Sequence, residues 1–247
     1  MPNQTQDSSW LENLKRKAQD LFAEESTVVD GIRSGFVDRA IVFIDLVGST
    51  SFKIEHRENP ENWILIIRQF SKLVSAAVQI SHGNVVKFIG DEVMASFEKA
   101  EHAGNFLVHV REIEEALHSV TGFATAIKIT ADFGPVYELR FEGHEAPDPQ
   151  GIVVDRCAGI SKYGVPGEVL ASAFFAEATW SLDWYEVGEV EVHGVGNVAV
   201  SQLGGSTADL EPRVAISRKE YASLKKEREL MRAELARLDP GSVTSCG

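Results

Sequence analysis

Two acidic residues of the sequence each follow a short apolar stretch of the kind that forms a strand. Asp45 ends the run 39–44 and precedes the small residues 47–50, and Asp91 lies in the turn 89–92 of an expected β-hairpin. Carboxylates at strand ends suit Mg²⁺ or Mn²⁺, and the amides of 47–50 could cradle phosphates. Two adjacent carboxylates repel unless a cation lies between them, so the pair predicts a metal site. Each residue also has a simpler explanation, because Asp45 could cap a helix and Asp91 could form a tight turn.

The overall composition limits the kinds of partner that the chain can have. The chain has 247 residues, 44% of them apolar, and a formal net charge of −13. Nucleic-acid-binding proteins attract phosphates with clustered Lys and Arg, so this charge argues against a nucleic-acid partner. A small anionic substrate would instead bind through a metal ion. Cys157 and Cys246 have no partner at zinc-site spacing, and we expect both to be reduced thiols.

Neither end of the sequence shows a targeting or membrane segment. The first residues lack the basic start and the apolar segment of a secretory signal. The apolar run Trp63–Ile67 is far shorter than the roughly 20 residues that a membrane-spanning helix needs. We therefore expect a soluble, cytoplasmic protein with no membrane partner.

The hydrophobic pattern divides the chain into three regions. Residues 1–37 hold an amphipathic helix and a linker, residues 38–205 form the main domain, and residues 206–247 hold a charged helix and a tail. The C-terminal helix could pack on its own domain or form a short coiled coil with a partner. In the main domain we expect strands at 39–44, 85–88, 93–97, 125–133, 168–171, 184–192 and 197–203, and helices at 60–82, 103–118, 155–162 and 174–179. This order predicts an α+β fold, an α/β sandwich.

Five short motifs carry a more specific signal. They are Phe43-Ile44-Asp45-Leu46-Val47-Gly48-Ser49-Thr50, residues 85–97 (VVKFIGDEVMASF), Phe133-Gly134-Pro135-Val136, residues 148–155 (DPQGIVVD) and residues 164–169 (GVPGEV). Their order and spacing over about residues 38–203 resemble the catalytic domains of class III nucleotide cyclases. The resemblance implies the class III adenylate/guanylate cyclase fold with a ferredoxin-like core, here with a helix added at each end.

The resemblance also implies a reaction and the residues that carry it. Asp45 and Asp91 would hold two divalent cations, Mn²⁺ or Mg²⁺, one activating the ribose 3′-hydroxyl and the other neutralising the triphosphate. The 3′-hydroxyl attacks the α-phosphorus and pyrophosphate leaves. The resemblance also has the backbone carbonyl of Leu46 bind a metal ion. The residues it implies in contact with the substrate are Phe43, Val47, Gly48, Ser49, Thr50 and Asp155. It further implies a head-to-tail homodimer, in which one subunit supplies the metal aspartates and the other supplies the residues that read the base.

Lys87 and Asp148 occupy the positions that read the base in this family. A Lys donor and an Asp acceptor suit adenine, but they could equally bind a different base in a narrower pocket. Outside such a pocket, Lys87 would be a solvated strand residue and Asp148 a loop residue before a proline.

Three positions depart from the family pattern. The transition-state asparagine falls at Asp155, the arginine four residues later at Gly159, and the triphosphate-binding lysine at His193. Losing a cation at the developing phosphate charge costs orders of magnitude in rate. Arg156 lies one turn from Gly159 and could supply a catalytic cation in its place, although its side chain could equally be solvated.

The full combination is most similar to the bacterial pyrimidine cyclases of Pycsar antiphage defence, whose pattern includes a stretch like Val154-Asp155-Arg156-Cys157-Ala158. That resemblance implies synthesis of cyclic UMP or cyclic CMP, a second messenger for a separate effector protein. Of the two we expect a uridylate cyclase that converts UTP to cyclic UMP. A cytidylate cyclase that makes cyclic CMP is nearly as well supported, because no residue separates uracil from cytosine. An adenylate cyclase and a non-catalytic nucleotide-binding dimerisation domain remain as alternatives.

Overall fold

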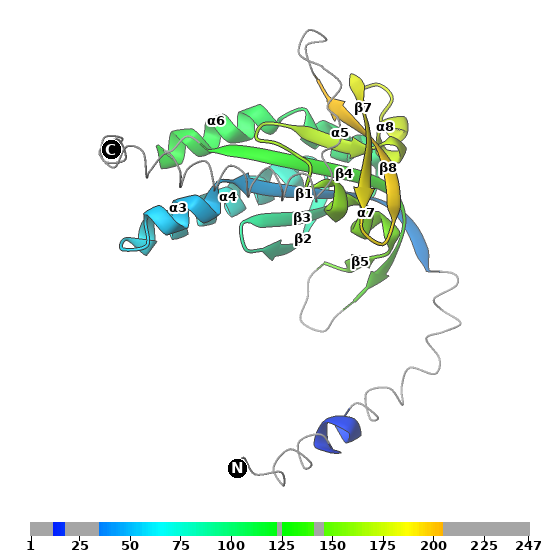
Figure 1. The fold of residues 1–247 in the computed structure, drawn as a ribbon, viewed down its shortest axis with the longest axis horizontal. Helices are drawn as coiled ribbons and strands as arrows, with labels where there is room; N and C mark the ends of the chain where they lie inside the picture. The colour runs from blue at the N-terminus through cyan, green and yellow to red at the C-terminus, as the bar shows by residue number, and fades with distance from the viewer. Residues whose placement is uncertain (1–11, 18–34, 123–124, 141–145, 205–247) are drawn as a thin grey trace, which may run out of the picture.

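The computed structural model describes residues 12–17, 35–122, 125–140 and 146–204. Within these residues the main domain has one mixed sheet in the order β2-β3-β1-β4-β6-β8-β7, with β5 paired to the end of β4 (Figure 1). The strands are β1 (Phe36–Val47), β2 (Gly83–Ile89), β3 (Glu92–Phe97), β4 (Ala126–Leu139), β5 (Asp148–Gln150), β6 (Val169–Ser172), β7 (Trp184–Val192) and β8 (Gly196–Leu203). The pairing of β4 with β6 is parallel and the other pairings are antiparallel.

Helices cover both faces of this sheet. They are α3 (Ser49–Glu55), α4 (Pro60–Ile80), α5 (Ala100–Leu107), α6 (Val110–Thr121), α7 (Ile152–Ile160) and α8 (Ala173–Ala178). Side chains alternate between the two faces along a strand. The β1 residues Ala40, Val42, Ile44 and Leu46 therefore join the core beneath α4, α5 and α6, and Ile41 and Phe43 join a second cluster with α7. Figure 1 shows α4 and α6 together on one side of the sheet and α7 on the other.

Helix α4 is the longest helix among the described residues. It is long and apolar enough to span a membrane by length and composition, with 22% of its most apolar window buried. The same helix has a regular inward stripe of Ile66, Phe70, Val74 and Val78, which packs into the core of the sheet. This stripe is the 3.6-residue pattern of an amphipathic helix on a protein core.

The expected α+β fold and most expected elements are confirmed, with three corrections. The single helix expected at 103–118 is two helices, because the His109 amide donates to the Phe106 carbonyl (3.2 Å) in a tighter three-residue turn between α5 and α6. Helix α3 was not expected. Strand β5 was also not expected, because Pro149 disfavours a strand, but β5 is short and pairs only with the end of β4.

The two terminal helices fall largely outside the described residues. Of the helix expected in residues 1–37, the structure describes 12–17, which are helical. The helix expected in residues 206–247 lies wholly outside the described residues.

Candidate active site

A row of charged side chains crosses the sheet on the face that carries α7. Asp45 on β1 lies opposite Glu92 on β3 and opposite Lys128 on β4. Directly opposed residues of antiparallel strands project to the same side. The Lys128 Nζ is 3.0 Å from the Asp45 carboxylate, and both side chains are 24% exposed. The structure therefore places Asp45 at an accessible sheet end, paired with one cation and beside a second acid.

Asp91 reaches the same sheet end through the β2–β3 turn. Its carbonyl accepts a hydrogen bond from the Leu46 amide (3.2 Å), which holds the turn against the residue after Asp45. Its carboxylate accepts a hydrogen bond from the Ser49 hydroxyl and lies 3.3 Å from Lys53 Nζ. The two aspartates predicted from the sequence are thus brought to neighbouring strand ends, and α3 holds the second one.

The three acids of this region have different electrostatic surroundings. Burial raises the pKa of Asp91, but the hydrogen bonds from Ser49 and Lys53 outweigh it, so its pKa lies below the usual value. Burial raises the pKa of Glu92, and repulsion from Asp45 raises it further. Glu92 is therefore the acid whose ionisation the neighbouring carboxylates disfavour, whereas Asp91 stays readily ionised.

The donor set fits divalent cations that share their ligands with a substrate. Among the described residues, no group of three His, Cys, Asp or Glu side chains is arranged to enclose a metal. Mg²⁺ is commonly bound by one or two carboxylates and completed by water and substrate phosphates, which an open pair such as Asp45 and Asp91 allows. Lys53 and Lys128 now neutralise these carboxylates, so they would have to give way to the cations.

Lys87 and Asp148 also come together on the α7 face. The Lys87 Nζ is 2.9 Å from both oxygens of Asp148, and the two side chains are 40% and 19% exposed. Lys87 lies opposite Met94, just after an irregularity in the β2–β3 pairing. Met94 in turn lies opposite Phe43, two residues before Asp45. The Lys87–Asp148 pair is therefore about 7 Å along the strands from the acidic row.

The other predicted substrate contacts fall between or beside these two pairs. Phe43 and Leu46 are buried in β1, Val47 ends that strand, and Asp155 is exposed on α7. Gly48 has a left-handed backbone (φ 79°), which favours glycine and turns the chain from β1 into α3. Ser49 and Thr50 then form the first turn of α3, with Ser49 buried and Thr50 exposed.

Arg156, predicted to supply a catalytic cation, is held inside the domain. Its guanidinium donates from Nε (2.5 Å) and Nη2 (2.9 Å) to Asp132, a β4 residue that is fully buried. Asp132 also accepts from the Ser172 hydroxyl and from the Phe133 amide (2.7 Å). The Phe174 ring lies 4.4 Å from the guanidinium carbon. With these contacts Arg156 neutralises a buried carboxylate, which favours a structural role over contact with a substrate.

Gly159 leaves no room for the side chain that the family pattern has there. A Cβ on Gly159 would lie 2.2 Å from Cγ1 of Val192 on β7. An arginine could therefore not be accommodated without moving β7 away from α7. His193, at the position of the family lysine, is exposed just after β7.

Three charged residues of the site were missed in the sequence. Lys53 lies one turn after Ser49 on α3, Lys128 is the β4 neighbour of Asp45, and Glu92 follows Asp91 directly. The spacing of Ser49 and Lys53 could have indicated a shared helix face. Lys128 could be found only from the strand register.

With this geometry established, comparison with known proteins supports the fold. No protein-family model and no curated protein matches the sequence. Solved structures do match, at low sequence identity. The adenylyl cyclase CyaB of P. aeruginosa is 19% identical with a TM-score of 0.62, over 71% of this chain and 97% of that one. The guanylate cyclase domain of RhGC from Catenaria anguillulae, solved in complex with GTP, is 17% identical with a TM-score of 0.61, over 69% and 98%.

A third match was solved as a non-canonical dimer. It is the guanylyl cyclase domain of the RhoGC fusion protein from Blastocladiella emersonii, 18% identical with a TM-score of 0.60, over 68% of this chain and 97% of that one. The domain described here thus has the fold of class III cyclase catalytic domains, as the sequence motifs predicted. At these identities the likeness defines the fold, and the chemistry has to be argued from the residues.

The role of Arg156 can be separated from catalysis by stability measurements. We expect Arg156→Met to lower the free energy of unfolding by about 3 kcal/mol, because it leaves the buried Asp132 carboxylate unpaired. The double variant Asp132→Asn/Arg156→Met should lose less, because the remaining amide is neutral and can still accept from Ser172. Urea unfolding of both variants measures the difference. An Arg156→Met protein as stable as the wild type but without activity would show that Arg156 acts on the substrate.

The raised pKa of Glu92 gives a pH-dependent prediction for the metal-free protein. A group whose folded pKa is raised disfavours folding once it ionises, so its cost is absent below its unfolded pKa and appears as pH rises through the folded pKa. Glu92→Gln should therefore melt above the wild type at neutral pH in EDTA, and this difference in melting temperature should shrink as pH falls through the raised pKa and be gone below about 4.5. A difference in melting temperature that stayed constant from acid to neutral pH would contradict the repulsion assigned between Asp45 and Glu92.

Proposed function

We propose that this protein is a nucleotide cyclase that converts a nucleoside triphosphate, with UTP favoured, into its 3′,5′-cyclic monophosphate and pyrophosphate. The observation that carries the proposal is the meeting of two pairs on one face of the sheet. Asp45 and Asp91 lie at neighbouring strand ends, and Lys87 and Asp148 lie together one step along the strands. One pair suits cation-bound phosphates and the other suits the edge of a base.

In the proposed site, different residues bind the cations and the phosphates. Asp45, Asp91 and the Leu46 carbonyl would hold two divalent cations, Mn²⁺ or Mg²⁺, which supply charge neutralisation and a more acidic 3′-hydroxyl. The turn at Gly48 and the first residues of α3 would bind the phosphates. Lys53 and Lys128, freed from the carboxylates, leave positive charge beside the triphosphate. The bond from the 3′-oxygen to the α-phosphorus forms as the bond to pyrophosphate breaks.

The base preference is proposed from the Lys87–Asp148 pair. An ammonium and a carboxylate side by side present a donor beside an acceptor. Uracil offers the matching O4 acceptor and N3–H donor, and cytosine offers N3 and the N4 amine. The similarity of residues 154–158 to the pyrimidine cyclases favours a pyrimidine substrate, and we choose UTP narrowly over CTP because no residue separates the two bases. Cyclic UMP would then serve as an antiphage signal read by a separate effector protein in the cytoplasm.

We further propose a homodimer with each active site at the interface, supported by two features. A guanylyl cyclase domain among the matched structures has the same fold and is dimeric, although its dimer is described as non-canonical. The α7 face around the candidate site also exposes apolar side chains that a partner would cover, Ile89 on the β2–β3 hairpin and Ile152 at the start of α7. In such a dimer the aspartates of one subunit would face the base-reading pair of the other.

Two other functions are favoured by particular observations. An adenylate cyclase would explain Lys87 and Asp148 equally well, and one matched structure is named an adenylyl cyclase. A domain that binds nucleotides without turnover would explain why Gly159 has no room for arginine and why His193 replaces lysine. The first alternative predicts cyclic AMP, and the second predicts metal-dependent nucleotide binding without a cyclic product.

A product assay with matched variants tests the reaction. The purified protein is incubated separately with ATP, GTP, CTP and UTP plus Mn²⁺, and products are identified by mass spectrometry. We expect cyclic UMP, and we expect Asp45→Asn and Asp91→Asn each to reduce its rate at least about 100-fold, because a lost metal carboxylate removes stabilisation of the phosphate charge. Asp38→Asn, an exposed site on the same strand, is the control and should keep full activity. An Asp45→Asn protein of wild-type activity would refute the metal assignment.

Mixing inactive variants tests whether the sites are shared between subunits. Asp45→Asn and Asp148→Asn subunits are each expected to be inactive alone. A heterodimer has one site with both functional pairs intact, so random exchange should restore up to about one quarter of wild-type activity. Mass spectrometry of the intact mixture verifies that heterodimers form. If verified heterodimers show no activity, the two pairs do not act across an interface.

A further inference from the structure

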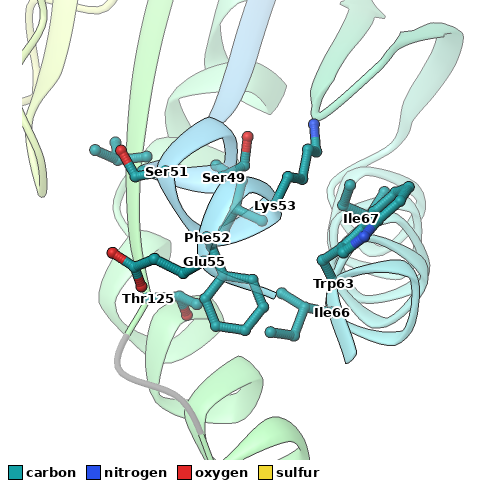
Figure 2. A pocket seen from close by; sticks show the side chains of 12 residues that line it. Ser49, Ser51, Phe52, Lys53, Glu55, Trp63, Ile66, Ile67 and Thr125 are labelled. Carbon is teal, nitrogen blue, oxygen red and sulfur yellow. The ribbon is translucent and has the colours of Figure 1, made fainter. Parts of the chain in front are cut away.

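The described residues contain a cavity of about 230 Å³ behind the candidate metal site, between α3 and the start of α4. Its lining comprises Leu46, Val47, Gly48, Ser49, Ser51, Phe52, Lys53, Glu55, Trp63, Ile66, Ile67 and Thr125. Figure 2 shows Phe52 of α3 with Ile66 and Trp63 of α4 on one side and Thr125 on the other. Lys87 and Asp148 are not part of this lining, so the cavity is separate from the base-reading pair. It is also smaller than the 300–1,000 Å³ typical of sites for drug-sized ligands, and smaller still than a nucleoside triphosphate requires.

The walls of the cavity are mainly apolar, with two aromatic rings. Phe52 and Trp63 face it from two different helices, and Ile66 and Ile67 lie beside Trp63 on α4. Burying a charged group against such walls is costly unless it is paired. The charged residues of the lining are Lys53 and Glu55, which carry opposite signs. An uncharged aromatic molecule therefore suits this space better than an ion.

One polar atom in the cavity has no partner. The Thr125 hydroxyl oxygen is buried and makes no hydrogen bond with any of the residues that the structure describes. Buried hydroxyl groups are almost always hydrogen-bonded, because an unpaired one loses the bonds it made with water. A ligand that carries one hydrogen-bonding group would satisfy this atom. The unpaired hydroxyl is a second sign, independent of the cavity's shape, that a molecule binds here.

Helix α3 connects the cavity to the candidate metal site. Phe52 forms part of the cavity wall, and its neighbours Ser49 and Lys53 hold the Asp91 carboxylate. The Lys53 ammonium also lies 6.0 Å from the centre of the Trp63 ring, so it bridges the wall of the cavity and Asp91. A molecule packed against Phe52 and Trp63 would restrict where Ser49 and Lys53 can place Asp91.

We propose that this cavity binds a small, uncharged aromatic molecule with one hydroxyl or amine group, and that its binding changes the metal affinity of the site through α3. The aromatic ring packs between Trp63 and Phe52, whose own ring is stacked on His56, and the polar group hydrogen-bonds with Thr125. The cavity shares Leu46, Gly48, Ser49 and Lys53 with the candidate site, and the bound molecule influences the proposed reaction through them without reacting itself. Its binding step therefore stands whether or not the protein is a cyclase.

Phenol and toluene are the probes for the binding step, because they differ by one hydroxyl group. Their affinities for the full-length, metal-free protein are measured by ligand-observed NMR titration. We expect phenol to bind more tightly than toluene. Thr125→Val keeps the side-chain shape and removes the hydroxyl, so it should weaken phenol about fivefold to tenfold and leave toluene unchanged. It should also melt no lower than the wild type, because the lost hydroxyl has no partner within the described structure.

Two further variants test the location. Ile67→Trp fills the cavity and should abolish binding of both probes, and Ile80→Ala, at an exposed position (79%) on the same helix, should change neither. Phenol that does not bind, or that binds equally well to wild type, Thr125→Val and Ile67→Trp, would overturn the proposed site. Thermal melting of each variant confirms that it is folded, so a lost signal reports the cavity.

The coupling step has its own measurement, which needs no nucleotide and no turnover. Free Mn²⁺ is quantified by electron paramagnetic resonance as the protein is titrated with and without saturating phenol. We expect phenol to change the Mn²⁺ affinity at least about fivefold in wild type and not in Ile67→Trp. An identical Mn²⁺ affinity with and without bound phenol would refute the coupling. A failed cyclase assay would leave both measurements unaffected.

Discussion

The pairing of β1 with β3 brings carboxylates together at one end of the sheet, and nearby lysine side chains offset the repulsion between them. Asp45 and Glu92 are opposed across that pairing, and Asp91 is held beside them by its backbone hydrogen bond to Leu46. Lys128 from β4 and Lys53 from α3 supply the compensating charges. A folded chain tolerates such a cluster only with cations nearby. The lysines therefore keep the metal-free site together and leave it ready for ions of higher charge.

The two faces of the sheet carry different kinds of residue. The face beneath α4, α5 and α6 is a continuous apolar core, so it fixes the strands and their register. The face with α7 has a smaller apolar cluster, including Ile41, Phe43 and Met94. Polar groups of the candidate site begin where this cluster ends, at Asp45 along β1. Because the register is set from the opposite face, polar residues can be exposed here without loss of the fold.

The sequence predicted candidate site residues that lie within motifs, and it did not predict the neighbours that the strand register brings to them. Asp45, Asp91, Lys87 and Asp148 could be identified because each lies within a recognisable motif at a defined spacing. Their partners could not be identified in the same way. Lys128 comes from a strand that is distant in sequence, and the buried carboxylate of Asp132 that binds Arg156 lies on that same strand. Both contacts depend on which residues of β4 project to the α7 face.

Arg156 and Gly159 show that a residue's position within a motif does not by itself determine where its side chain lies in the structure. By sequence, an arginine three residues before the family position looked like a substitute for it. On a helix, however, a shift of three residues turns the side chain by about 60° and moves it by almost one turn. Arg156 consequently faces Asp132, whereas position 159 is closed by Val192.

The Lys87–Asp148 pair limits what the site can read on its own. A donor beside an acceptor recognises one edge of a base, and that edge has a counterpart in adenine, cytosine and uracil. Discrimination between these bases must then come from the space available to the ring, because a hydrogen-bonding pair does not measure ring size. In a shared site that space is bounded partly by the second subunit. Base selectivity in this fold would therefore depend on how the two subunits close around the pocket as well as on the residues that touch the base edge.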